Sequence, residues 1–165
     1  MTSPHKYGTT RQALVLLALL ALCLAVGAVG GAVTSTSVGS WYQQLRKPPF
    51  NPPNWVFGPV WTTLYGLMAY AAYRVLKLAP SPAQRTAIVL FYAQLALNAA
   101  WSWMFFAAHS PALGMINIVP QLCFVVATAT CFIRLDRIAG ICLLPLIAWV
   151  TFATALNAAI WRLNG

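Results

Sequence analysis

The sequence predicts an all-α fold, a polytopic membrane protein built as a five transmembrane helix bundle in a single integral membrane domain, residues 1–165. Of its residues 61% are hydrophobic and only 7% are charged, whereas a soluble domain carries about 25% charged residues. The ten Lys and Arg, set against one acid, lie in short clusters between long uncharged runs. Such clusters flank membrane spans. Because the basic residues form no continuous stripe, they do not indicate a nucleic-acid partner.

Four uncharged runs define the expected helices, and they cover residues 12–44, 48–73, 86–133 and 138–161. A span needs about 20 apolar residues, so the third run is long enough for two helices. His109-Ser110-Pro111 supplies a turn between these two. The predicted helices are therefore residues 12–33, 54–77, 85–107, 112–134 and 138–161. We expect an integral, multi-pass protein surrounded by lipid, in a membrane that the sequence does not identify.

The first helix, residues 12–33, follows Lys6 and Arg11 and shares this basic start with signal peptides. Its apolar stretch exceeds the about 7–15 residues of a cleavable signal, so a retained helix is favoured. Gly27 and Gly31 lie four residues apart in it, and small residues at this spacing let helix backbones approach closely. Packing within the bundle and a homodimer face are both compatible with these glycines.

The long loop 34–53 separates the first two helices. Loops of about twenty residues are uncommon in compact domains and are usually functional. Trp41 and Tyr42 could anchor this loop at the membrane interface or cover a site in the bundle, and the anchor is the favoured interpretation.

The next helices contain prolines at positions with different consequences. Pro59 and Pro145 lie near the starts of their helices, where a missing N–H costs little. Pro120 lies deeper in the helix 112–134 and is expected to bend it. With five spans, seven basic residues lie on the side of the N-terminus and three on the other. In an inner membrane this excess places the N-terminus in the cytoplasm.

Three of the helices carry a stripe of large side chains that includes a Trp. The stripes are Phe57-Trp61-Tyr65, Asn98-Trp101-Phe105 and Trp149-Ala153-Leu156-Asn157. An amide is costly against hydrocarbon and points into a bundle, so Asn98 and Asn157 orient their stripes inward. The amides could serve only to join helices. The favoured interpretation is an internal cavity lined by indole and phenol rings, which is typical of a small-molecule pocket.

The sequence contains no set of residues typical of catalysis. Asp136 lies between Arg134 and Arg137 and is expected to pair there, and His109 is expected to be solvated rather than to bind a metal. The cysteines form no Cys-x-x-Cys pair and are expected to be free thiols. We therefore expect no enzyme, no metal site and no obligatory cofactor. Flat, hydrophobic molecules suit such a cavity.

Three motifs cover nearly the whole chain after its first residues. They are Lys47-Pro48-x-x-x-Pro52-Pro53-x-Trp55-x-Phe57-x-Pro59-Val60-Trp61-Thr62-x-Leu64-Tyr65, Gln94-Leu95-x-Leu97-Asn98-x-x-Trp101-x-x-x-Phe105-Phe106 and Pro145-Leu146-x-x-Trp149-x-x-x-Ala153-Thr154-x-Leu156-Asn157-x-x-Ile160-Trp161-Arg162-x-Asn164. In order and spacing they resemble the tryptophan-rich sensory protein / translocator protein family, also called the peripheral-type benzodiazepine receptor family.

This resemblance implies a five-helix bundle, often a homodimer, that binds porphyrins such as protoporphyrin IX and serves as a receptor or sensor in tetrapyrrole regulation or stress response. Transport of porphyrins or other hydrophobic molecules, and light-dependent porphyrin degradation, are the alternatives. Ala158 stands where the cholesterol motif of animal members needs a Tyr, which argues against sterol binding there. By motif position, the resemblance implies these ligand-binding residues: Trp61, Tyr65, Asn98, Trp101, Phe105, Trp149, Ala153 and Leu156.

Overall fold

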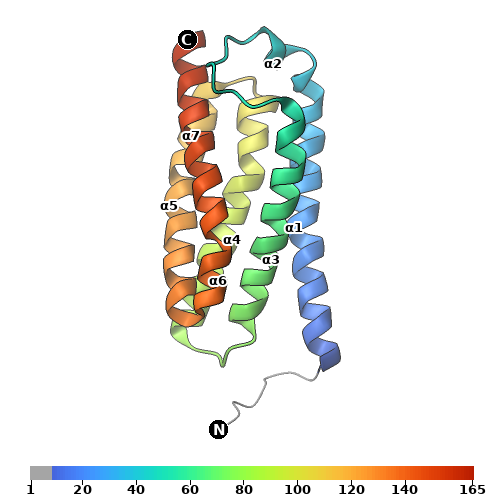
Figure 1. Ribbon diagram of the computed structural model, residues 1–165, viewed down its shortest axis with the longest axis vertical. Helices are drawn as coiled ribbons and strands as arrows, with labels where there is room; N and C mark the ends of the chain where they lie inside the picture. Colours follow the sequence, from blue (N-terminus) through green and yellow to red (C-terminus); the bar gives the residue numbers. More distant parts are fainter. Residues whose placement is uncertain (1–8) are drawn as a thin grey trace.

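The structure is a computed structural model that describes residues 9–165, and within this range it contains helices and no strands. Figure 1 shows long helices side by side, with the α2 segment at the same end as the C-terminus. Lys6, assigned to the flank of the first helix, lies outside the described range. The elements are α1 (Thr9–Val38), α2 (Trp41–Gln44), η1 (Asn54–Val56), α3 (Phe57–Leu76), α4 (Pro82–Ser102), η2 (Trp103–Ala107), α5 (Pro111–Leu135), α6 (Arg137–Cys142) and α7 (Leu144–Asn164).

Four helical stretches of the described chain are long and apolar enough to cross a membrane: Thr10–Val38, Pro82–Ala107, Pro111–Leu135 and Arg137–Asn164. The all-α membrane bundle and the multi-pass location are thereby confirmed. α3 is missing from this set because its Trp, Tyr, Thr, Gly and Arg residues lower its mean hydropathy. Its 20 residues still extend about 30 Å, the thickness of the hydrocarbon core, and it runs alongside the other helices in Figure 1. Four of the five predicted spans are therefore confirmed as apolar helices of spanning length, and the fifth, α3, stays a prediction supported by its length and position.

α1 is longer than predicted, and the predicted loop 34–53 is correspondingly shorter. Ser35 donates its hydroxyl to the Ala32 carbonyl at 2.8 Å, and Thr36 donates to the Val33 carbonyl at 2.7 Å. These bonds satisfy the hydroxyls inside the helix, so a polar run that reads as loop continues as helix to Val38. The short helix α2 then occupies part of the remaining connection.

α4 begins three residues earlier than predicted because Ser81 caps it, accepting a bond from the Gln84 N–H at 3.1 Å ahead of Pro82. At its other end the helix widens into the π-helical segment η2. There the Ser110 N–H donates to the Phe105 carbonyl, five residues back, at 3.1 Å. The wider turn buries two consecutive rings, Phe105 and Phe106.

The helix predicted at 138–161 is interrupted at Leu143, between α6 and α7. Pro145 has no N–H, and its ring conflicts with the carbonyl four residues earlier. The Leu143 N–H bonds to the Gly140 carbonyl at 3.0 Å, which tightens the chain there before α7 begins. In contrast, α5 continues through Pro120.

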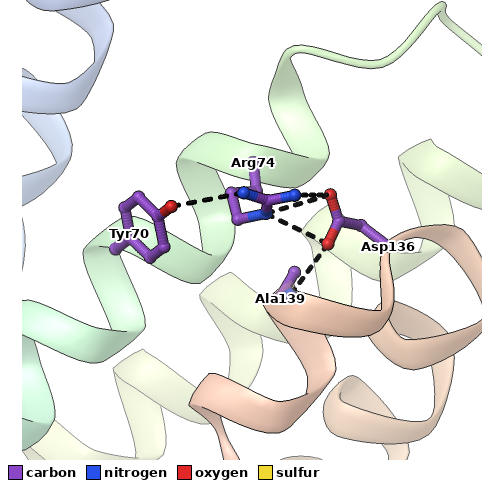
Figure 2. A network of polar contacts seen from close by, with 4 residues as sticks. All are labelled: Tyr70, Arg74, Asp136 and Ala139. Atoms are coloured by element: carbon purple, nitrogen blue, oxygen red, sulfur yellow. Dashed lines mark hydrogen bonds and ion pairs between the residues drawn. The ribbon is translucent and has the colours of Figure 1, made fainter.

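Asp136 pairs with a helix distant in sequence, not with its neighbours Arg134 and Arg137 as predicted. The Arg74 Nε lies 3.0 Å from both carboxylate oxygens, and a terminal Arg74 nitrogen lies 2.8 Å from one of them. Figure 2 shows Arg74 held between Tyr70 and Asp136. The carboxylate also accepts the Ala139 N–H at 2.9 Å and so caps α6. The bonds from Arg74 hold the pKa of Asp136 below its usual value.

Candidate functional site

A cavity of about 570 Å³ lies inside the bundle, in the half next to α2. α1, α3, α4, α5 and α7 all contribute to its walls, together with η2. Its volume is typical of small-molecule sites. The structure brings all eight predicted residues to this cavity, and their binding of a ligand stays a prediction. The eight are Trp61, Tyr65, Asn98, Trp101, Phe105, Trp149, Ala153 and Leu156.

Aromatic rings form broad, flat parts of the cavity wall. Trp61 and Tyr65 stack with ring centres 5.5 Å apart, and Trp101 and Phe105 stack at 4.9 Å. In each pair the residues are four positions apart on a helix, which brings their side chains onto one face. The rings of Phe57 in α3 and Trp149 in α7 also contact each other edge to face, with their centres 5.7 Å apart. The cavity therefore offers apolar faces suited to a flat ligand.

The two asparagines of the stripes have protein partners and also line the cavity. The Tyr65 hydroxyl donates to the Asn98 side-chain oxygen at 2.5 Å, which joins α3 to α4. The Trp101 indole N–H donates to the Asn157 oxygen at 3.2 Å, and the Asn157 amide donates to the Pro111 carbonyl at 2.8 Å. Both asparagines thus join helices, an interpretation that the sequence left open, and they do so at the cavity wall.

The glycines of α1 allow that helix to approach the rings. A Cβ at Gly27 would lie 2.5 Å from an atom of the Tyr65 ring, and one at Gly30 would lie 3.0 Å from the Ser102 hydroxyl. A side chain at Gly31 would meet nothing within 4 Å. Gly27 therefore serves packing within the bundle, and the homodimer stays a prediction.

The connection after α1 covers the cavity. Tyr42 is buried and lines it, and the Tyr42 hydroxyl donates to the Asn51 side chain at 2.9 Å. Arg46 and Asn164 exchange two hydrogen bonds of 2.9 Å between the Arg46 backbone and the Asn164 amide. Tyr42 is therefore part of a cover over the cavity. The favoured interpretation, an anchor at the membrane interface, is wrong for this residue because its side chain is buried.

His109 is exposed, as the sequence predicts, and it also contributes to the same end of the bundle. Its ring stacks on Trp41 at 4.9 Å, and its Nε2 lies 3.1 Å from the Ser37 hydroxyl. The backbone of His109 has a φ of 51°, which closes the turn between η2 and α5. The Trp41 and His109 rings therefore hold the cover to the turn between η2 and α5.

Sequence reasoning missed the contributions of α1 and α5 to the cavity. Gln121 and Ile118 of α5 line it, as do Phe106 and the α1 glycines. Gln121 carried a usable signal, because an amide inside an apolar span has the same reason to point inward as Asn98. The glycines carried no signal for the cavity, since their spacing indicates only close packing.

The polar groups of the cavity are neutral amides, hydroxyls and indole N–H groups. The one acid, Asp136, lies at the α6 end of the bundle, opposite α2 in Figure 1. Among residues 9–165, no three His, Cys, Asp or Glu side chains lie together as metal ligands. The arrangement can stack on a flat molecule and form neutral hydrogen bonds with it.

The sequence matches the TspO/MBR family over residues 19–162. It is 40% identical to the tryptophan-rich protein TspO of Chlorobaculum tepidum over 155 residues, which cover 93% of this chain and 98% of the relative. It is 39% identical to the tryptophan-rich sensory protein of Cereibacter sphaeroides over 148 residues, or 90% of each chain. Identity to the translocator protein of Homo sapiens is 36% over 126 residues, or 75% of each chain. The chain therefore belongs to the TspO/MBR family.

Proposed function

We propose that the protein is a membrane receptor or sensor that binds porphyrins, such as protoporphyrin IX or haem-type tetrapyrroles, in the cavity between its helices. Its output would serve tetrapyrrole regulation or stress response. The observation that carries the proposal is the convergence of Trp61, Trp101 and Trp149, from three different helices, on one cavity of about 570 Å³. Two relatives are named tryptophan-rich sensory protein and translocator protein, and these names agree with a sensor or carrier role.

The cavity's chemistry fits a porphyrin in two respects. A flat macrocycle buries most area against flat rings, and the stacked Trp61–Tyr65 and Trp101–Phe105 pairs present such faces. The Asn98 oxygen is occupied by Tyr65, whereas within residues 9–165 its NH₂ group has no protein acceptor. That group is available to donate to a ring nitrogen of the ligand.

A cation near the cover suits the acidic substituents of such a ligand. The Lys47 ammonium lies 4.7 Å from the centre of the Tyr42 ring, and Tyr42 lines the cavity. Carboxylates that extend from the ligand toward α2 would reach this charge at the membrane surface, where they lose least of their hydration. The macrocycle would occupy the apolar part of the cavity.

Titration of the purified protein with protoporphyrin IX tests the proposal. Porphyrin absorbance is the readout, so that removal of an indole does not alter the signal. Trp61→Ala and Trp149→Ala each remove a stacking face, and we expect each to weaken binding by about tenfold or more. Trp103→Ala is the matched control, because Trp103 is 54% exposed and does not line the cavity. Unchanged affinity in both cavity variants would contradict the proposal.

The same preparation separates the alternatives. A transporter would carry porphyrin into sealed vesicles, whereas a receptor would bind it without flux. Light-dependent degradation would appear as loss of porphyrin absorbance under illumination and would decrease in Trp61→Phe. A purely structural membrane protein would show no saturable binding.

A further inference from the structure

A second hollow lies on the outside of the bundle, between α3 and α7. Val60 and Thr63 of α3 line it, together with Ala148 and Phe152 of α7. Its surface is almost wholly apolar, because the Thr63 hydroxyl donates to the Pro59 carbonyl of its own helix at 2.9 Å. This groove, which is defined by these residues, opens toward the lipid, since Thr63 and Ala148 are exposed.

Trp149 belongs to both the groove and the internal cavity. On the cavity side it contacts the Phe57 ring at 5.7 Å, and toward the groove it contacts the Phe152 ring at 5.6 Å. α3 packs mainly against α1, and α7 mainly against α5, so the two helices have little direct contact with each other. The Trp149 indole therefore forms the partition between the groove and the cavity.

The partition at Trp149 is held less firmly than the cover at the α2 end. The cover is fastened by the hydrogen bonds of Tyr42 with Asn51 and of Arg46 with Asn164. In the part of the chain that the structure describes, Trp149 makes no side-chain hydrogen bond, and it packs against other rings and against the apolar core. Rotation of this indole costs dispersion contacts only, and no polar group loses a partner.

We propose that the groove is a lateral portal through which a flat, largely apolar ligand passes from the lipid into the cavity, with Trp149 as its gate. The proposal rests on the proposed function, since it supplies that site with its ligand. A hydrophobic ligand partitions into the bilayer, and a route between α3 and α7 exposes no polar surface to the hydrocarbon.

Obstruction of the groove tests the portal. Ala148→Phe places a ring in the groove without touching the cavity, because Ala148 lines only the groove. We measure the association and dissociation rates of protoporphyrin IX by stopped flow, with the protein in lipid nanodiscs. Both rates should decrease by about tenfold, whereas the equilibrium affinity should stay within about twofold, because the path changes and the bound state does not. Val126→Phe, at a 43% exposed position of α5 outside both hollows, should leave the rates unchanged.

A second readout does not depend on porphyrin binding. Ala153→Cys introduces a thiol into the cavity, and its modification by bilayer-dissolved N-phenylmaleimide is followed by mass spectrometry at position 153. Addition of Ala148→Phe should slow this modification by about tenfold. Thr63→Phe obstructs the groove from α3 and replaces Ala148→Phe should that variant not fold.

The outcomes are distinct for the two proposals. Unchanged porphyrin rates and unchanged thiol modification in the obstructed variants would overturn the portal. Lost affinity with unchanged modification at position 153 would overturn it as well. Absence of porphyrin binding in the unmodified protein would defeat the proposed function, and thiol modification would then decide on the portal alone.

Discussion

The hydrogen bond from Tyr65 to Asn98 joins two walls of the cavity, and Tyr65→Phe removes it with little other change. Phe keeps the ring against which Gly27 packs and which Trp61 stacks upon. Tyr65 is 6% exposed and Asn98 is 7% exposed, so the Asn98 oxygen loses a partner that lipid cannot replace. Leaving a buried acceptor unpaired costs about 1–3 kcal/mol in soluble proteins, and hydrogen bonds between membrane helices average about 0.6 and reach about 1.7 kcal/mol. We predict a decrease of about 1 kcal/mol in the free energy of unfolding.

The assay is reversible unfolding in mixed micelles, carried out as a double-mutant cycle with Asn98→Leu. If the bond contributes as argued, the two substitutions should be non-additive by about 1 kcal/mol. Tyr65→Phe should also weaken porphyrin binding by a few fold, because the Asn98 amide loses its orientation, and this effect should vanish in the Asn98→Leu background. Additivity within about 0.3 kcal/mol would refute the reasoning.

Two further predictions concern charge and cavity volume. Asp136→Asn keeps a cap on α6, because Asn caps about as well as Asp, but it removes the ion pair with Arg74. Since the folded pKa of Asp136 is lowered from 3.8, the pair stabilises the fold above that value. This contribution is lost as the pH falls through the lowered pKa. The free energy of unfolding of the wild type should therefore exceed that of the variant by about 1 kcal/mol at pH 7, and the difference should disappear in acid. Equal stability of the two proteins at pH 7 would contradict the argument. Ala153→Leu fills part of the cavity and should weaken porphyrin binding by about tenfold. The control is Ala155→Leu, at an exposed position of α7, which should leave the affinity unchanged. Equal affinity in the two variants would argue against the cavity as the binding site.

The parts of the site that could be predicted share one physical cause. Asn98 and Asn157 are amides inside apolar runs, and the cost of placing an amide in lipid fixes which helix face points inward. Trp101 and Ala153 follow from helical spacing alone. The parts that could not be predicted depend on contacts between distant segments. Arg74 and Asp136 are 62 residues apart in sequence, and nothing local distinguishes Arg74 from the arginines that neighbour the acid.

The π-helical segment η2 shows the same limit on a smaller scale. Spacing on a regular α-helix directs Trp101 and Phe105 to one face but turns Phe106 about 100° away from Phe105. The wider turn at Trp103–Ala107 buries both Phe rings and brings Trp101 within 5.7 Å of Phe106. No residue in this segment requires a hydrogen bond to the carbonyl five residues back, so the periodicity of the sequence could not reveal the π-helical turn.

The mean hydropathy of the helices varies with the kind of side chain that each contributes to the cavity wall. α1 lies in the most apolar of the four spans and contributes mainly small side chains to the wall, whereas α4, with Asn98 and Trp101, lies in the least apolar one. α3, which supplies Trp61 and Tyr65, lies outside that set altogether. A helix that supplies indole, phenol and amide groups to the cavity wall on one face and meets lipid on the other cannot be aliphatic all round. A low hydropathy in a helix of spanning length therefore accompanies indole, phenol and amide groups on the cavity wall here.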